Sequence, residues 1–96
     1  MTKWLATSDR QLVIVVFYAP WAGSYELLNG FLQMLQVRIP NISIARVNIE
    51  KHPELAAKMR ISNVPTTVLF RNHEVVDMFA GAISRKKLTA KITPYL

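Results

Sequence analysis

The stretch from Phe17 to Glu26 constrains the fold of this chain more than any other part of the sequence. It follows a continuous apolar run, Leu12 to Val16, of the kind found in buried strands, and precedes apolar residues at helical spacing from about Ser24. A proline and a glycine break the chain between these segments. The sequence therefore predicts a strand, a turn and a helix, with residues 21–25 at the helix N-terminus, where backbone N–H groups are unpaired.

Length and composition predict a single α/β domain over residues 1–96. A chain of this length supports one core, and its hydrophobic content of 51% indicates a packed globule rather than a disordered chain. No apolar run approaches the roughly 20 residues that a membrane span needs. The N-terminus also lacks a signal-peptide pattern. We therefore expect a cytoplasmic protein that has no membrane partner.

The formal net charge of +6 raises the question of a nucleic-acid or acidic partner. The basic residues are spread along the chain except for one group near the C-terminus, consisting of Arg85, Lys86, Lys87 and Lys91. We interpret this group as the solvated face of a helix. Nucleic-acid binding through this face is the weaker alternative, because the chain shows no aromatic platform for single strands and no groove-reading helix motif.

Hydrophobic periodicity predicts alternating strands and helices that form a mixed sheet between helical layers. Strands are expected over residues 11–18, 43–49, 66–71 and 74–79, and helices over residues 2–8, 24–38, 53–59 and 84–93. In the long helix, Leu27 and Met34 are expected to widen the buried face. Asn72 and His73 form the predicted two-residue hairpin between the last two strands, and Ser84 is expected to cap the final helix.

The turn Trp21-Ala22-Gly23-Ser24-Tyr25-Glu26 resembles the active-site turn of thioredoxins, whose usual form is Trp-Cys-Gly-Pro-Cys-Lys. Other family motifs have counterparts in the family's order: the Val-Ala-Lys-x-Asn-(Ile/Val)-Asp strand at 44–50, the (Ile/Val)-Pro-Thr-x-x-x-Phe strand at 64–70, the Lys-Asn-Gly-Glu hairpin at 71–75 and the Gly-Ala-x-Ser turn at 81–84. The resemblance covers nearly the whole chain and implies a thioredoxin-like fold.

The family's usual first strand has no counterpart in this sequence. The resemblance therefore implies a thioredoxin-like fold truncated at the N-terminus, with a mixed four-stranded sheet flanked by helices. An exposed sheet edge at the place of the missing strand would offer a homodimer interface, because unpaired edges tend to pair with other chains.

The resemblance also predicts that the family's reaction is absent. Disulfide exchange needs an attacking thiolate and a resolving thiol, but Ala22 and Tyr25 occupy those positions and the chain contains no cysteine. The buried acid of many thioredoxins maps to Val16, the lysine near it to Arg46, and the lysine after the turn to Glu26. We expect a redox-inactive protein that is not an enzyme. The alternative is a thiol–disulfide oxidoreductase disabled in this version or engineered at Ala22, or one acting with the cysteines of a partner.

No other chemistry is indicated by the sequence. Ser24 is interpreted as the N-cap of the long helix rather than as a nucleophile, because no His/Asp pairing is evident. His52 and His73 lie on separate predicted loops and lack metal-ligand spacing. A glycine-rich phosphate loop is missing as well. We therefore expect neither a cofactor nor a metal.

A peptide-binding cleft is what the resemblance implies in place of catalysis. In the family, the proline matching Pro65 is cis, and the residue before it offers its backbone N–H and C=O to an extended partner, as in β-augmentation. The resulting protein- or peptide-binding site comprises Trp21, Gly23, Ser24, Tyr25, Val64, Pro65, Ala80 and Gly81. The alternative is that Trp21 packs on the protein's own surface and Tyr25 fills the space of the absent disulfide.

Overall fold

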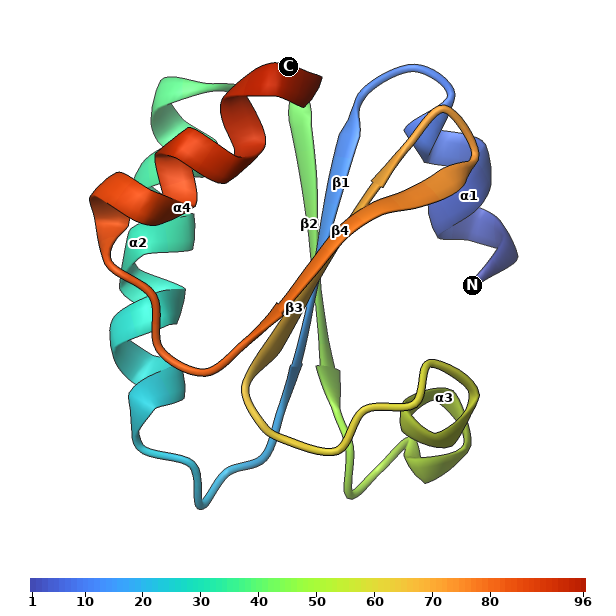
Figure 1. Cartoon of the computed structure of the whole chain (residues 1–96), viewed down its shortest axis with the longest axis vertical. Helices are drawn as coiled ribbons and strands as arrows, with labels where there is room; N and C mark the ends of the chain where they lie inside the picture. Colours follow the sequence, from blue (N-terminus) through green and yellow to red (C-terminus); the bar gives the residue numbers. More distant parts are fainter.

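A mixed four-stranded sheet forms the centre of the computed structural model, which describes residues 1–96 (Figure 1). The strand order is β2-β1-β3-β4. Strand β1 (Leu12–Tyr18) pairs in parallel with β2 (Ile42–Asn48) and antiparallel with β3 (Thr66–Arg71), which pairs antiparallel with β4 (Glu74–Ala80). The predicted mixed sheet is confirmed.

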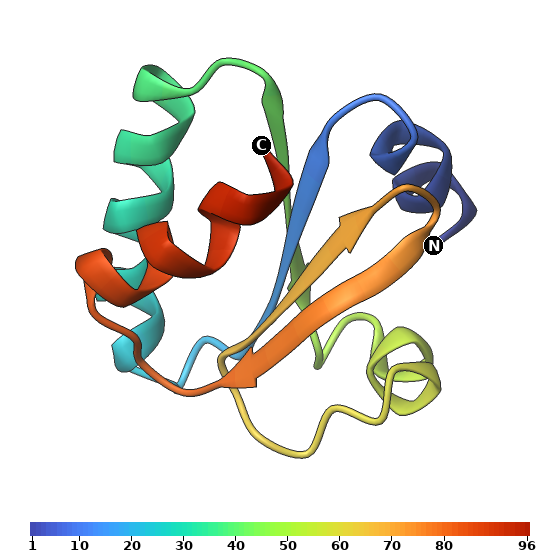
Figure 2. The same cartoon turned by 45° about the horizontal axis from the view of Figure 1, so that its top comes forward.

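Helices cover both faces of the sheet. Helices α2 (Ser24–Arg38) and α4 (Arg85–Ile92) lie on one face, and α1 (Thr2–Ser8) and α3 (Pro53–Lys58) lie on the other (Figures 1 and 2). A short 3-10 turn, Thr93–Tyr95, follows α4. None of the helices combines the length and the apolar character needed to cross a membrane.

Strand β1 supplies the centre of the core on both faces of the sheet. All residues from Leu12 to Phe17 are buried, and successive side chains point to opposite faces. Leu12, Ile14 and Val16 pack with the buried residues of α2 and α4. Val13, Val15 and Phe17 belong to the second cluster, against which Trp4 of α1 packs. This two-sided burial explains why the strand is continuously apolar rather than alternating.

The buried face of α2 is narrower than expected. Leu28, Leu32 and Leu35 are buried against the sheet, but Leu27 and Met34 are 60% and 40% exposed. The expectation that these two residues widen the buried face is therefore wrong. The helix packs on one side only, and Leu27 and Met34 lie on the side that faces solvent.

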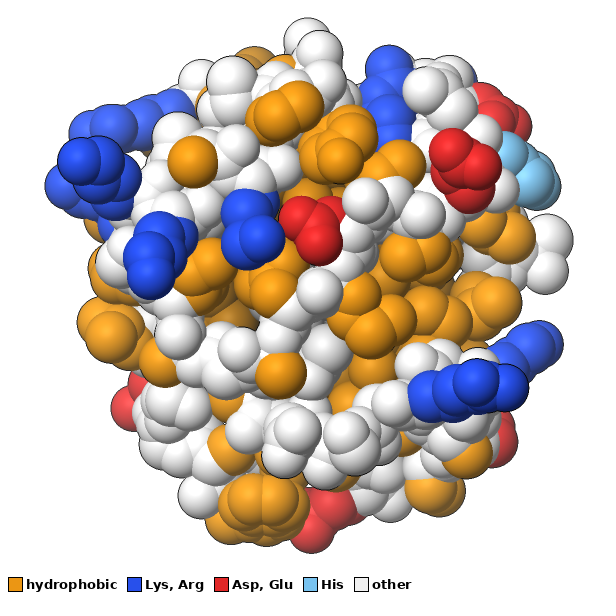
Figure 3. Space-filling model, in the orientation of Figure 1, with side chains coloured by type: hydrophobic (Ala, Val, Ile, Leu, Met, Phe, Trp, Pro, Cys, Tyr) orange, Lys and Arg blue, Asp and Glu red, His pale blue; other side chains and the backbone are white.

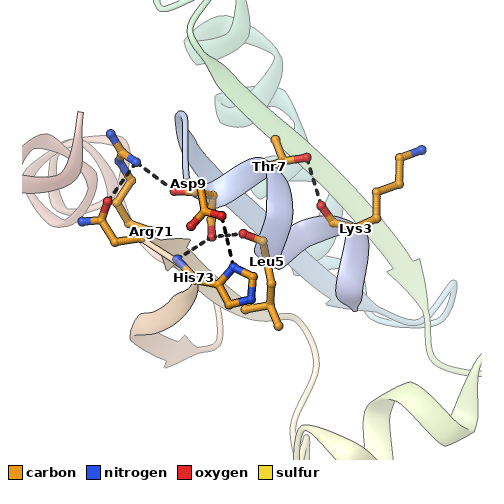
Figure 4. A network of polar contacts seen from close by, with 8 residues as sticks. Lys3, Leu5, Thr7, Asp9, Arg71 and His73 are labelled. Carbon is orange, nitrogen blue, oxygen red and sulfur yellow. Dashed lines mark hydrogen bonds and ion pairs between the residues drawn. The ribbon is translucent and has the colours of Figure 1, made fainter.

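A polar network ties the C-terminus of α1 to the β3–β4 hairpin (Figure 4). The buried Ser8 hydroxyl donates to the Leu5 carbonyl at 2.6 Å and accepts from the His73 N–H at 3.0 Å. The Ser8 carbonyl accepts from Arg71 Nη1 and from the Asn72 N–H, both at 2.8 Å. Asn72 and His73 have φ values of 55° and 68°, so they form the predicted two-residue hairpin. The network supports His73 at a position where glycine is usual.

One buried hydroxyl in the core leads to a stability prediction. Thr67 Oγ1 is buried without a hydrogen-bond partner, and Thr67 lies opposite Val16 in the β1–β3 ladder. Thr67→Val keeps the shape and removes the desolvated hydroxyl, so we expect it to raise the free energy of unfolding by about 1 kcal/mol. Urea unfolding would show a higher midpoint with an unchanged slope.

The adjacent threonine provides the matched control. The Thr66 hydroxyl donates to the Asn63 carbonyl at 2.6 Å, so Thr66→Val should lower stability by about 1 kcal/mol. If Thr67→Val also lowered stability, the Thr67 hydroxyl would have a partner, such as an ordered water, that satisfies it.

Candidate functional site

The turn after β1 leads directly into α2. The Ala22 N–H donates to the Ala19 carbonyl at 3.0 Å, and the Tyr25 N–H donates to the Ala22 carbonyl at 3.1 Å. Gly23 is the N-cap and already has helical φ and ψ values of −60° and −31°. Ser24 is therefore the first helical residue and makes no side-chain capping bond, so its expected role as N-cap is wrong. The reason is that the helix begins at Ser24 itself, one residue earlier than an N-cap at this position would require.

The two aromatic residues of this turn lie in different environments. The Trp21 side chain is 69% exposed. Tyr25 is half-buried, packs against the core cluster beneath α2, and stacks on Tyr18 with 4.2 Å between ring centroids and 11° between ring planes. Most of the Trp21 surface is therefore free, whereas Tyr25 is held by the protein's own packing.

Tyr25 remains a neutral phenol at ordinary pH. Burial raises the pKa of Tyr25 above its usual value, and the nearby Arg46 guanidinium only partly opposes this. Arg46 Nε donates to Asn29 Oδ1 at 2.6 Å, which fixes the arginine between β2 and α2. A protonated phenol is no nucleophile, so Tyr25 offers a stacking surface and a hydroxyl group but no equivalent of a thiolate.

The loop before β3 lies next to the end of β4. The Val64–Pro65 peptide bond is cis, and Pro65 is buried. The Pro65 carbonyl accepts from the Gly81 N–H at 2.7 Å. Gly81 has a φ of +83°, a backbone conformation that favours glycine. This bond places Ala80 and Gly81 beside the proline.

Val64 presents free backbone groups. It is half-buried and lies outside every helix and strand, and neither its N–H nor its C=O takes part in a backbone hydrogen bond. Buried or partly buried backbone groups are normally paired. An extended chain beside Val64 would find one donor and one acceptor at this position.

A hollow of about 320 Å³ lies between the turn and the loop. It is lined by Trp21, Ile49, Ile61, Ser62, Asn63 and Val64. A second hollow of about 170 Å³ shares residues 61–63 of this loop and is also lined by Met78, Phe79 and Ala80. Figure 3 shows hydrophobic side chains at the lower edge of the molecule, where the β1–α2 turn lies in Figure 1.

The structure brings some of the predicted site residues together and separates others. Trp21 and Val64 line the first hollow, and Ala80 lines the second. Gly23, Ser24 and Tyr25 line neither. Sequence reasoning missed Ile49 and Ile61, which line the same hollow as Trp21. Ile61 could have been found from the sequence, because it lies in the loop that leads into Pro65.

Comparisons with known proteins agree on one family. The family model described as "Thioredoxin" matches residues 3–94. A thioredoxin of Chlamydia caviae is 31% identical over 84 residues, which cover 88% of this chain and 82% of that protein. Human Glutaredoxin-3 is 34% identical over 88 residues, which cover 92% of this chain but only 26% of that protein. The X-ray structure of Fasciola hepatica thioredoxin has a TM-score of 0.90 at 29% identity, and covers 99% of this chain and 90% of that chain.

Proposed function

This chain belongs to the thioredoxin family, and we propose that it acts as a binding module that performs no thiol–disulfide exchange of its own. The family's reaction needs two thiols, and this chain has no cysteine. A methyl group stands at Ala22 and a neutral phenol at Tyr25. Any thiol in a reaction at this site would have to come from a partner.

A shared hollow is the observation that supports binding. The exposed Trp21 and the unpaired backbone of Val64 line the same space of about 320 Å³. Tryptophan is among the residue types that most often anchor protein interfaces. An extended peptide beside Val64 would gain two backbone hydrogen bonds, as in β-augmentation. The proposed ligand is therefore an extended protein segment with an apolar side chain that packs between Trp21 and Ile61.

A peptide screen tests the proposal. An array of extended 15-residue peptides is probed with the whole chain, and the best binders are titrated in solution with amide NMR shifts as the readout. We expect shifts at Trp21 and Val64. Trp21→Ala should weaken binding by at least about tenfold, which corresponds to about 1.4 kcal/mol. Val64→Pro removes the backbone donor and should also weaken binding, provided that its thermal unfolding remains cooperative.

Control variants separate the cleft from other surfaces. Val75→Ala removes apolar surface from an exposed position of β4 and should leave the affinity unchanged. If Trp21→Ala bound as tightly as the wild type, the cleft would not be the site. Shifts confined to the basic group of α4, Arg85 to Lys91, would instead favour an acidic partner on that face.

A further inference from the structure

An apolar stripe runs along the solvent side of α2. It consists of Leu27, Gly30, Met34 and Val37, and we call it the α2 seam. Leu27, Met34 and Val37 are 60%, 40% and 84% exposed. In Figure 3, hydrophobic side chains are visible at the left margin of the molecule, where α2 lies in Figure 1. The spacing of three, four and three residues is that of the apolar positions in helices that pair with another helix.

Gly30 has no role that the isolated chain explains. A glycine in a helix interior costs about 1 kcal/mol relative to alanine. A Cβ atom at Gly30 would meet nothing within 4 Å, and Gly30 does not have a positive φ. Neither packing nor backbone conformation within the monomer requires glycine at this position. A residue without a side chain on an exposed apolar stripe would, however, let a second helix approach closely.

We propose that the α2 seam pairs with the α2 seam of a second copy of this chain, with the two helices antiparallel. The seam is symmetric about Leu32, because each of its residues has a counterpart at the same distance on the other side. A two-fold axis at this level places Leu27 level with Val37 of the partner subunit. It also places Met34 level with Gly30 of the partner subunit. A large side chain then meets an empty position, which is how well-packed helix layers interdigitate.

Charge also favours the antiparallel arrangement. Glu26 and Arg38 flank the seam, again at equal distances from Leu32, and both are exposed. Antiparallel pairing brings Glu26 of one copy to the same end as Arg38 of the partner subunit. Parallel pairing would bring like charges together, which is unfavourable at an interface. The surface is therefore self-complementary in shape and in charge, as a two-fold interface must be.

The dimer should be weak and reversible. The seam has four positions on a helix of 15 residues, and an interface of this extent falls short of the roughly 1,000 Å² of a stable complex. We expect a dissociation constant on the order of 0.1 mM.

Sedimentation equilibrium of the whole chain between about 10 µM and about 1 mM tests the proposal. The average mass of the wild type should rise from that of a 10.9 kDa monomer towards twice that value. Val37→Glu places a charge in the seam without disturbing the core, and should weaken the dimer at least about tenfold. The matched control is Ala57→Glu, which makes a comparable change at an exposed position of α3 on the opposite face of the sheet.

Exchanging the charges of Glu26 and Arg38 tests whether the two α2 helices pair in the antiparallel orientation. Arg38→Glu should weaken the dimer because it puts two acidic residues at each end, and adding Glu26→Arg should restore it. A wild type that stays monomeric over the whole range would overturn the proposal. So would a dimer that survives Val37→Glu, and the exposed edge strand β2 would then be the interface to examine.

Discussion

The wild-type chain should reduce insulin disulfides no faster than dithiothreitol alone, whereas the double variant Ala22→Cys/Tyr25→Cys should gain catalytic turnover. The variant restores an attacking thiol and a resolving thiol at the spacing of the family's motif. The first thiol would lie beside the N-terminus of α2, where the helix dipole lowers a cysteine pKa and increases the thiolate fraction. We expect a rate at least about ten times the background.

The backbone of the turn already suits a disulfide at these positions. The Tyr25 N–H donates to the Ala22 carbonyl at 3.1 Å, and a turn closed in this way holds its end Cα atoms within about 7 Å. Disulfides span Cα separations up to about 6.8 Å. Replacing Tyr25 removes its stacking on Tyr18, so the double variant should be somewhat less stable than the wild type.

The single variant Ala22→Cys is the control for turnover. It supplies the attacking thiol alone, so its attack should release one insulin sulfur as a thiol and leave the other in a mixed disulfide with the introduced cysteine. No second thiol of the protein resolves that bond, so turnover should be limited to the rate at which dithiothreitol cleaves it. Turnover by the wild-type chain would contradict the redox-inactive function proposed for it. A double variant that neither forms its internal disulfide nor turns over substrate would show that Ala22 and Tyr25 do not lie at the positions of the family's cysteines.

Val16→Asp should lower the free energy of unfolding by about 3 kcal/mol at neutral pH. The variant introduces the acid that many thioredoxins carry at this position. Val16 is fully buried between the sheet and α2, among Leu28 and other apolar side chains. Its neighbour Thr67 could donate one hydrogen bond to the introduced carboxyl. Arg46 lies opposite Val16 on β2, but its side chain is exposed and its Nε donates to Asn29. One neutral donor and an exposed guanidinium do not compensate for the desolvation of a buried carboxylate.

The loss of stability should depend on pH. Burial raises the pKa of the introduced carboxyl above about 3.9, the usual value of an aspartic acid. The folded state then binds more protons than the unfolded state above that pH, so stability falls as pH rises from about 4 towards the folded-state pKa. The variant should be closest to the wild type near pH 4 and furthest from it near pH 7.

Val16→Asn separates the effect of a buried charge on stability from the effect of a buried polar group. It has nearly the same shape as the aspartate variant but does not titrate, so its deficit in urea unfolding should stay constant between about pH 4 and about pH 7. If Val16→Asp matched the stability of the wild type at neutral pH, the core would still accommodate an ionised acid. The cost of burying an acid would then not explain why valine occupies position 16.

Much of the fold could be predicted because it depends on patterns within short segments. The continuous apolar run of β1 predicted a strand buried on both faces, and residues 12–17 are all buried. The hairpin residues Asn72 and His73 and the capping residue Ser84 lie where the sequence placed them. The lack of cysteine is a property of composition that no packing can change. It limits the chemistry of the site whatever contacts the side chains make.

One failed prediction is local: α2 begins at Ser24 with Gly23 as its N-cap, and sequence patterns place the end of a helix only to within a residue or two. The others concern contacts between segments distant in the sequence. An apolar residue on α2 can face the sheet or the solvent, and periodicity alone assigned Leu27 and Met34 to the wrong side. Ile49 and Ile61 line one hollow with Trp21, and this depends on how the segment after β2 and the loop after α3 pack against the β1–α2 turn.

The sequence by itself determined which elements form and that the chain supplies no thiol of its own, because these depend on local backbone preference and on the atoms present. Only the tertiary structure decided which surfaces remain open. Burial depends on which faces of separate elements meet, and that is settled when the sheet and helices pack together. The hollow beside Val64 and the exposed seam of α2 both arise at that step.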